Sequence, residues 1–358
     1  MLDVALIGTG YFSQFHYRAW QRMHDVRIVA LHSQDAAIGQ AFANEYGIAT
    51  VFSDIDEMLR TSKPALVDIV TPPTSHAHIV RQCMAHHIPC ICQKPFCNDL
   101  KQARALVNDI EAAGAKVVIH ENFRFQPWYR ELHRLLAKKL IGDHYEISFK
   151  LRPGDGQGPE AYLDRQPYFQ QQEQFLVRET GVHYIDVFRY LFGDITGLFA
   201  RLSTLNPVIA GEDAGVVIME FATGARGVFN GNRLSDHATD ELRRTMGEMV
   251  IEGSAGTLLL DGYGKIHHRR HGQETWLECH YDYEDIDFGG DCVYRMNRHV
   301  VDHLMTGSTL ENDASAYLIN REIEAAVYRS HEEGVWIPLN DKNDKNDKND
   351  KNLSLIHI

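Results

Sequence analysis

Two side chains that can carry protons, Lys94 and His183, are the most informative residues of this 358-residue sequence. Lys94 follows the short run 90–93, and Pro95 comes directly after it. If the run forms a parallel strand, the ammonium group at its carboxyl end points into the crevice where open α/β sheets bind ligands. An isolated Lys-Pro pair is more often a solvated surface feature. The elements on both sides therefore decide between the two interpretations.

His183 lies four residues after Glu179, in a segment that leads into an amphipathic helix ending near Phe192. On one helical turn the two side chains share a face and can form a hydrogen bond. A carboxylate that accepts one ring N–H fixes the imidazole tautomer and leaves the other nitrogen free to act as a general base. The spacing therefore predicts a Glu179–His183 pair. Taken by itself, the pair is more often a structural histidine and a solvated acid, because the chain has 20 histidines.

The N-terminal segment has the order of elements that a dinucleotide-binding turn requires. The sequence predicts an apolar strand at 4–7, a tight turn at Gly8-Thr9-Gly10, and a helix at 12–23 with apolar residues at helical spacing. The two glycines allow backbone N–H groups to approach a pyrophosphate, which then lies at the helix N-terminus. Ser13 stands where a third glycine is usual, and it is small enough to keep the helix close to the strand.

Alternating strands and helices continue as far as residue 122. Further strands are expected at 26–31, 65–70, 88–92 and 117–119. Helices are expected at 34–46 and at 54–59, where Asp54 and Glu57 have capping-box spacing. Two more are a helix capped by Thr74 or Ser75 that runs through His87, and a helix capped by Asn98 that ends at Gly114. This alternation predicts a parallel, doubly wound sheet with helices on both faces. We therefore assign residues 1–122 to a Rossmann domain that binds NAD or NADP.

Ser33 bears on the choice between these two cofactors. It stands at the tip of the second strand, where a carboxylate normally binds the adenosine ribose of NAD. Loss of that acid removes the repulsion that excludes a 2′-phosphate. However, no arginine follows to bind a phosphate, and Asp35 can still reach a ribose. We leave NAD and NADP open, with a slight preference for NADP or dual use.

A different pattern begins after residue 122. A helix is expected from Pro127 to Leu140, and the short alternating runs that follow predict an antiparallel sheet. These runs cover 145–151, 198–202, 216–221, 226–230, 248–252, 257–260 and 265–269. The segment 153–174, rich in Gly, Gln and Pro, predicts a long loop, and such loops are usually functional or part of an oligomer contact. Residues 123–339 are thus predicted to form a second α/β domain for substrate binding and oligomerisation.

Composition argues against several classes of partner. The formal charge is −13 with no basic stripe, which argues against binding to nucleic acid or anionic membranes. No apolar run reaches about 18 residues, so no membrane-spanning helix is expected. No basic region precedes the apolar N-terminus, and we expect a cytoplasmic protein. The six cysteines lack the spacing of a zinc site, so reduced core thiols and no metal are predicted.

The last residues differ in kind from the rest of the chain. From Asn340 to Asn352 the triplet Asp-Lys-Asn repeats, and so polar a segment cannot build a packed core. The final hexapeptide 353–358 looks like a translated sequencing adapter. We therefore expect 340–358 to be a disordered low-complexity tail of artefactual origin, with the folded part ending near Leu339.

Five motifs in register resemble the glucose-fructose oxidoreductase / inositol dehydrogenase (Gfo/Idh/MocA) family. They are GTGYFSQFH at the start, TPPTSH at 71–76, QKP at 93–95, ENFRFQP at 121–127 and GVHYID at 181–186. The resemblance covers residues 3 to about 338. It implies a Rossmann domain followed by an α/β domain with a large open, mostly antiparallel sheet that often forms homodimers or homotetramers. It also implies a closing helix at 314–333 that packs back on the nucleotide domain.

The same resemblance implies oxidation of a sugar or polyol hydroxyl, with hydride passing to C4 of the nicotinamide. Lys94 matches the lysine of the family's Glu-Lys-Pro, which polarises the reacting oxygen and relays its proton. His183 matches the acid/base histidine, Glu179 its orienting carboxylate, and Asp186 a mainly structural carboxylate. Arg124, with Lys94 and His183, is expected at the substrate. The residues expected to line the cofactor are Gly8, Gly10, Tyr11, Phe12, Ser33, Thr71, Pro72, His76, Gln93, Lys94 and Asn122.

Gln93 departs from the family pattern, because a glutamate usually precedes the lysine. The exchange leaves Lys94 without that neighbouring carboxylate. The tracts QKPF and HENFRFQPWYR resemble a branch that acts on free sugars or their lactones, including branched pentoses such as D-apiose. Two other functions stay open, a dinucleotide-binding sugar sensor without turnover and an NAD-dependent glycoside-cleaving enzyme. Net accumulation of reduced cofactor distinguishes a dehydrogenase from both.

Overall fold

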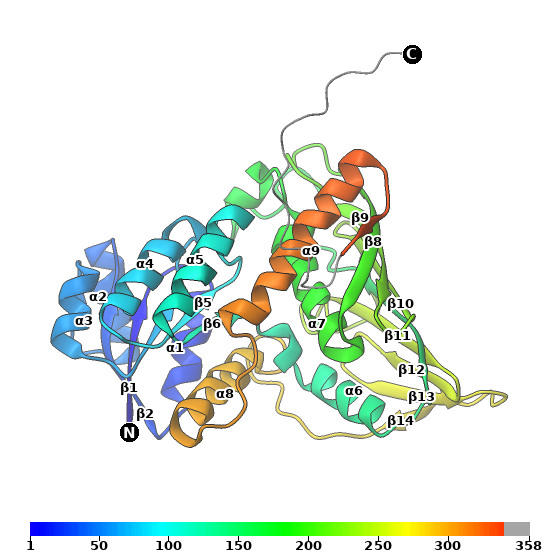
Figure 1. The fold of residues 1–358 in the computed structure, drawn as a ribbon, viewed down its shortest axis with the longest axis horizontal. Helices are drawn as coiled ribbons and strands as arrows, with labels where there is room; N and C mark the ends of the chain where they lie inside the picture. Colours follow the sequence, from blue (N-terminus) through cyan, green and yellow to red (C-terminus); the bar gives the residue numbers. More distant parts are fainter. Residues whose placement is uncertain (340–358) are drawn as a thin grey trace, which may run out of the picture.

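The structure, a computed structural model, describes residues 1–339 as two halves, each built on its own β-sheet (Figure 1). The tail predicted at 340–358 lies outside the described residues. The first half contains β1 (Leu2–Ile7), α1 (Ser13–Gln21), β2 (Val26–His32), α2 (Ala36–Tyr46), β3 (Val51–Phe52), α3 (Ile55–Ser62), β4 (Leu66–Ile69), α4 (Pro73–Ala85), β5 (Cys90–Gln93), α5 (Leu100–Ala113) and β6 (Val117–His120).

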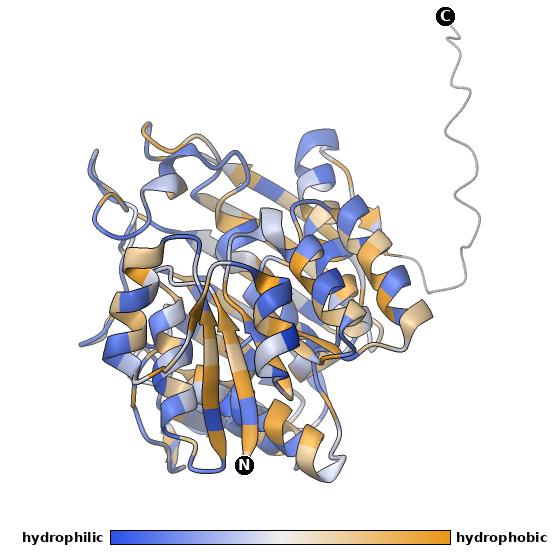
Figure 2. Ribbon diagram, turned by 90° about the vertical axis from the view of Figure 1, so that its left-hand side faces the viewer, coloured by the Kyte–Doolittle hydropathy of each residue, from blue (hydrophilic) through white to orange (hydrophobic). Residues whose placement is uncertain are grey.

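The first sheet is parallel and has the strand order β3-β2-β1-β4-β5-β6. This is the order of the dinucleotide-binding fold, and it confirms the doubly wound sheet predicted from the alternation. Strands β4, β5 and β6 are wholly buried, as expected where helices cover both faces. Figure 2 shows hydrophobic strands in the centre of this half, with helices of mixed hydropathy around them. Because parallel strands end at one edge, the turns after β1, β4, β5 and β6 meet there.

Two of the predicted helix-end signals are confirmed. At the start of α3, Asp54 Oδ1 accepts the N–H of Glu57 at 2.7 Å. At the end of α5, Gly114 adopts the left-handed conformation with φ of 60°, which costs glycine little because it has no Cβ.

Two other helix starts differ from the prediction. Helix α4 begins at Pro73, so Thr74 and Ser75 lie inside it and do not cap it. A proline suits the first helical position, because its missing N–H would have no partner there. Asp99 rather than Asn98 caps α5, and its carboxylate accepts a backbone N–H in the first turn at 2.8 Å.

The second half forms a large, mostly antiparallel sheet, as expected. Its strand order is β14-β13-β12-β11-β7-β10-β9-β8-β15, and within it β7 and β10 pair in parallel. The elements of this half are η1 (Phe123–Phe125), α6 (Pro127–Ala137), β7 (His144–Leu151), η2 (Pro167–Gln171), η3 (Leu176–Gly181), α7 (Val182–Phe192), β8 (Ile195–Ser203), β9 (Ala214–Phe221), β10 (Arg226–Asn232), β11 (Gly247–Gly253), β12 (Gly256–Leu260), β13 (Ile266–Arg270), β14 (Leu277–Cys279), α8 (Cys292–Thr306), α9 (Ala314–Glu333) and β15 (Ile337–Pro338).

Three strands and one α-helix are absent from the sequence prediction, as are the short elements η1, η2 and η3. Strands β3, β14 and β15 have two or three residues, too few to show an alternation. Helix α8 is long, and its buried residues recur at helical spacing. However, Asp291 at its N-cap has a left-handed backbone conformation and its side chain makes no capping hydrogen bond. Gly289 and Gly290 precede it with positive φ, so the segment before the helix resembles a loop.

Helices α6, α7 and α9 lie on the face of the second sheet that looks toward the first half (Figure 1). Alternate strand residues such as Phe149, Phe221 and Phe229 are buried beneath them. Helix α9 contacts both α5 of the first half and β8 of the second. The strand ends of the first sheet therefore face the helices that cover the second sheet, and the candidate site lies between them.

Candidate active site

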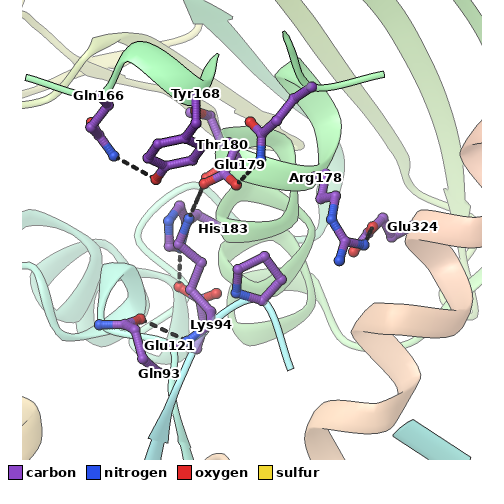
Figure 3. Close-up of polar contacts among 12 residues, drawn as sticks. Gln93, Lys94, Glu121, Gln166, Tyr168, Arg178, Glu179, Thr180, His183 and Glu324 are labelled. Carbon is purple, nitrogen blue, oxygen red and sulfur yellow. Dashed lines mark hydrogen bonds and ion pairs between the residues drawn. The ribbon is translucent and has the colours of Figure 1, made fainter. Parts of the chain in front are cut away.

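Lys94 projects from the end of β5 toward the second half of the molecule (Figure 3). Its Nζ donates hydrogen bonds to the backbone carbonyl and to the carboxylate of Glu179, both at 2.9 Å. The lysine side chain is 17% exposed, so the pair is only partly shielded from water. Glu179 thus supplies the carboxylate that Gln93 was expected to leave missing.

Glu179 lies in a π-helical turn, η3, rather than in an α-helix. The carboxylate of Glu212 holds the start of this turn by accepting two of its backbone N–H groups, both at 3.1 Å. A π-turn is wider than an α-turn, so residues four apart no longer share a face. The predicted hydrogen bond between Glu179 and His183 is therefore wrong, and each side chain pairs with a residue of the first half instead.

His183, in the first turn of α7, pairs with Glu121 (Figure 3). Its Nδ1 contacts Oε1 of this wholly buried carboxylate. Phe123 stacks on the imidazole, with ring centroids 3.8 Å apart and planes 4° apart. Because the carboxylate accepts the Nδ1–H, we assign His183 the tautomer whose Nε2 is an acceptor. A general base needs that tautomer.

Glu121 is the site residue that the sequence analysis missed as a partner. A signal was available, because an acid directly follows the last parallel strand, at the sheet edge where Lys94 also lies. The second carboxylate oxygen of Glu121 accepts the hydroxyl of Tyr317 from α9 at 3.3 Å. The carboxylate that orients the histidine is therefore itself held by the helix that joins the two halves.

The carboxylate of Glu179 is kept charged by its neighbours. Burial raises its pKa, but Lys94 and a hydrogen bond from Gln172 outweigh that effect and hold the pKa of Glu179 below its usual value. Gln172 Nε2 donates to Oε1 at 2.8 Å. Tyr168, about half exposed on the same loop, lies near this carboxylate, and burial raises the pKa of Tyr168 to about 12. The loop predicted at 153–174 thus brings an amide and a neutral phenol to the site.

Arg124 does not lie open at the rim of the crevice. Its guanidinium donates to both carboxylate oxygens of Asp186, at 2.7 and 2.6 Å, and it also contacts Glu311. The arginine side chain is 13% exposed and Asp186 is fully buried. A bidentate pair of this kind uses the donors that a sugar would need. The structure therefore places Arg124 in a contact that joins η1 to α7, and not at the expected substrate rim.

The turn between β1 and α1 has the shape that a dinucleotide needs. Gly8 has φ of +116°, and a Cβ there would lie 2.1 Å from the carbonyl oxygen of Val70, so glycine is required. A Cβ at Gly10 would meet no described protein atom within 4 Å, so glycine there leaves space in front of the turn. Asn122, after β6, has a buried Nδ2 that finds no partner within residues 1–339. An open turn and an unpaired donor at one sheet edge fit a bound dinucleotide.

Ser33 and Asp35 are both engaged by the protein at the tip of β2. Ser33 Oγ lies 3.0 Å from Thr9 Oγ1 and donates to the carbonyl of Asp35 at 2.8 Å. The carboxylate of Asp35 caps α2, because its Oδ1 accepts two backbone N–H groups of the first turn. One oxygen of this carboxylate is therefore used structurally, which leaves the other for a ribose hydroxyl.

The other expected cofactor residues lie along the same edge in different surroundings. Tyr11 is exposed and Phe12 is partly buried, both directly before α1. Thr71 and Pro72 form the turn into α4, and His76 is wholly buried behind this turn. Burial lowers the pKa of His76 to about 4, so this imidazole is neutral. Direct contact of these side chains with a cofactor remains a prediction.

Within residues 1–339, no helix is both long enough and apolar enough to cross a membrane. The same part of the chain contains no group of three His, Cys, Asp or Glu side chains arranged to hold a metal ion. All six cysteines are free, and burial raises the pKa of Cys92 well above its usual value, so that thiol is a weak nucleophile.

The fold and the matching family profiles define an NAD-binding oxidoreductase. A sequence profile described as an oxidoreductase family with an NAD-binding Rossmann fold matches residues 2–121. A second profile, the GFO/IDH/MocA C-terminal domain, matches residues 129–259. The chain therefore belongs to the GFO/IDH/MocA family of oxidoreductases, which confirms the resemblance drawn from the five motifs and the expected nicotinamide dinucleotide.

Named relatives are dehydrogenases of sugars and polyols. D-apiose dehydrogenase from Paraburkholderia graminis is 31% identical over 94% of this chain and 89% of that protein. Inositol 2-dehydrogenase from Rhizobium meliloti is 24% identical over 71% of this chain and 73% of that protein. Among solved structures, an oxidoreductase from Agrobacterium radiobacter in complex with NAD+, L-tartaric acid and magnesium has a TM-score of 0.86 at 25% identity. That comparison covers 94% of this chain and 98% of that one.

Proposed function

We propose that the protein oxidises a hydroxyl group of a sugar or polyol, with Lys94 and His183 acting on the reacting oxygen. One observation carries the proposal: two proton-bearing side chains, each paired with a carboxylate from the other half, lie where the two halves meet. NAD, when bound, takes up the hydride that leaves the carbon. The turn at Gly8 and Gly10 and the unpaired amide nitrogen of Asn122 support its binding beside this pair.

The two side chains have complementary roles in this proposal. His183 Nε2 accepts the hydroxyl proton, and Glu121 stabilises the imidazolium that results. Lys94 donates a hydrogen bond to the same oxygen and stabilises its developing negative charge. The C–H electron pair leaves as hydride, the O–H electron pair becomes the second C–O bond, and the proton ends on His183.

The substrate that we propose is a branched pentose such as D-apiose. The 31% identity to a D-apiose dehydrogenase over most of both chains supports this choice. Gln172 and Tyr168 also support it, because amide and hydroxyl groups form hydrogen bonds with sugar hydroxyls. Arg124 and Asp186 neutralise each other and are not assigned to the substrate.

A test of this function starts from the purified protein, NAD or NADP, and a panel of D-apiose, aldoses, inositols and sugar lactones. We expect net accumulation of reduced cofactor with D-apiose. Lys94→Met should lower kcat by about a hundredfold or more, the usual scale for a positioned proton-transfer group. Lys116→Met, which changes an exposed lysine, is the matched control and should keep wild-type turnover.

Two results would contradict the proposal. Cofactor binding without reduction across the whole panel would indicate a sensor. Cleavage of a glycoside without net reduced cofactor would indicate a glycosidase that re-oxidises the cofactor in each cycle.

We also propose that the protein forms a homodimer or homotetramer through the outer face of the nine-stranded sheet. One row of residues crosses five strands on this face, and it is apolar except for one serine. Ile218, in the middle strands, is 39% exposed although it is apolar. The residues of the row are Val250, Ser148, Val228, Ile218 and Phe199.

Sedimentation of Ile218→Glu tests this assembly. We expect the variant to sediment as a monomer under conditions where the wild type is a dimer or tetramer, because a charge in an apolar interface loses its hydration. Met305→Glu, an exposed apolar position on α8, is the control and should not change the assembly. A monomeric wild type, or an unchanged Ile218→Glu variant, would contradict the proposed interface.

A further inference from the structure

A chain of buried side chains runs from the end of β5 into the core of the first half. Gln93 Oε1 accepts the backbone N–H of Lys94 at 2.7 Å, and Gln93 Nε2 lies 3.2 Å from His16 Nε2. His16 Nδ1 lies 2.8 Å from Asp68 Oδ2, which also accepts the indole N–H of Trp20 at 2.7 Å. His16 and Asp68 have no exposed surface, and Gln93 is 8% exposed. This series of hydrogen-bonded side chains thus links the end of β5, where Lys94 lies, to α1 and β4.

The two ends of this chain fix where its protons lie. The N–H of Lys94 can only donate, so the carbonyl oxygen of Gln93 faces it and the amide NH₂ faces His16. Burial raises the pKa of the Asp68 carboxyl, but hydrogen bonds from His16 and Trp20 lower it, and the pKa stays below its usual value. Ionised Asp68 accepts the Nδ1–H of His16, which leaves Nε2 as the acceptor. We therefore assign His16 the neutral Nδ1–H tautomer.

We propose that His16 and Asp68 are positioning residues of the catalytic site. They hold the Gln93 amide in one orientation, and the amide in turn holds the backbone of Lys94 at the point where the lysine side chain leaves the sheet. The proposal deepens the proposed function and rests on it, because it assigns these residues to the placement of the Lys94 ammonium. It also gives a reason for glutamine at position 93, since a neutral histidine nitrogen requires a donor.

A glutamate at position 93 would have to change the protonation of the chain. Both of its oxygens accept, so one takes the N–H of Lys94 and the other faces the lone pair of His16. Uptake of a proton by His16 relieves this repulsion and leaves an imidazolium between two carboxylates. The other titratable groups that face His16 are Asp68 on β4 and His120 on β6, whose ring centroid is 4.2 Å away. Burial lowers the pKa of His120 to about 3, so it adds no charge.

Substitutions at position 16 can separate hydrogen bonding from simple packing. A glutamine there can offer its oxygen to Gln93 and its NH₂ to Asp68, as the neutral imidazole does, but it cannot take up a proton. A leucine offers neither group. We expect His16→Gln to keep kcat within about threefold of wild type and His16→Leu to lower it about tenfold, the scale of a lost buried hydrogen bond. His268→Gln, a buried histidine on β13 of the other half, is the control and should leave kcat unchanged.

Variants that carry glutamate at position 93 test the positioning role more directly. Gln93→Glu by itself should gain an ionisation in its pH–rate profile, because activity now requires a proton on His16. The double variant Gln93→Glu/His16→Gln cannot bind that proton. We expect its kcat to fall more than about tenfold below the product of the single effects. Additive effects in this cycle, or equal kcat for His16→Gln and His16→Leu with unchanged thermal unfolding, would overturn the positioning role.

A measurement without substrate tests the tautomer itself. In nitrogen-15 NMR of the wild-type protein, the imidazole signals that disappear in His16→Gln should show a neutral ring with the proton on Nδ1. An imidazolium, or a proton on Nε2, at neutral pH would overturn the proposal. Because this experiment needs no turnover, failure of the proposed function would appear separately, as unchanged turnover in Lys94→Met.

Discussion

The two charge pairs that link the halves differ in how firmly their side chains are held. Both pairs join the two halves of the molecule. In one, Lys94 of the first half pairs with Glu179 of the second; in the other, His183 of the second half pairs with Glu121 of the first. The lysine is 17% exposed and has two acceptors on one residue, whereas the histidine is 7% exposed, stacks on Phe123, and has a wholly buried partner. We infer that the histidine is oriented before substrate binds, while the ammonium can leave Glu179 for a substrate oxygen.

Replacing each carboxylate by an amide shows how much each pair contributes to turnover. We expect the larger loss of kcat at Glu121. Glu121→Gln should lower kcat by about a hundredfold, because the buried imidazolium that forms during the reaction loses its counter-charge. Steady-state kinetics with the best substrate of the panel measures this loss. Cofactor affinity, measured by fluorescence titration, should change little, because Glu121 contacts the histidine and α9.

The matching change on the lysine side should have a smaller effect. Glu179→Gln should lower kcat about tenfold, because the ammonium keeps the backbone carbonyl and gains an amide oxygen as neutral acceptors. Glu179→Asp keeps the charge and should lie between this variant and the wild type. A larger loss in Glu179→Gln than in Glu121→Gln would reverse our ranking of the two pairs.

A still smaller loss of activity is expected on removal of the hydrogen bond from the loop residue Gln172 to Glu179. Gln172→Leu removes the donor to Oε1 and should lower kcat/KM by about threefold, the scale of one partly exposed hydrogen bond. The exposed neighbour Gln171 provides the control, since Gln171→Leu should behave as the wild type. If both variants lose activity equally, the loop rather than the Gln172 contact is responsible.

The lysine pair should also contribute to stability in a pH-dependent way. The pKa of Glu179 is held below its usual value in the folded protein, so its contribution is present above the unfolded pKa of about 4.3. It is lost as pH falls through the lower folded pKa. Thermal unfolding should therefore show Glu179→Gln melting a few degrees below the wild type at neutral pH, with the two curves converging in acid. A constant difference at all pH values would show that charge is not its cause.

The first half was largely predictable because its signals are local. Apolar runs of four to seven residues, the turn at Gly8-Thr9-Gly10 and the capping acid Asp54 each act within a few residues. The second half was harder at its edges, since β14 and β15 are too short to show a pattern and α8 starts without a capping side chain. The sheet itself followed from alternation, as in β9, where buried and exposed residues take turns.

The site was predictable residue by residue but not in its pairings. Lys94 and His183 stood out by type and context, yet spacing in the sequence assigned Glu179 to the wrong partner. The π-turn at 176–181 depends on Glu212, a residue far along the chain, so its width could not be anticipated from local spacing. Partner choice across two halves is a tertiary property. These pairings follow only from the tertiary structure, in which the ends of β5 and β6 lie opposite α7.

In the proposed mechanism, Lys94 and His183 come from different halves and act in the same chemical step. A double-mutant cycle in kcat tests it directly, with Lys94→Met, His183→Ala and the double variant assayed under saturating cofactor and substrate. Residues that act as a unit are strongly non-additive, so the double variant should be no more than about threefold slower than the slower single variant. Multiplication of the two single losses in the double variant would show that the side chains act independently, and would contradict the account.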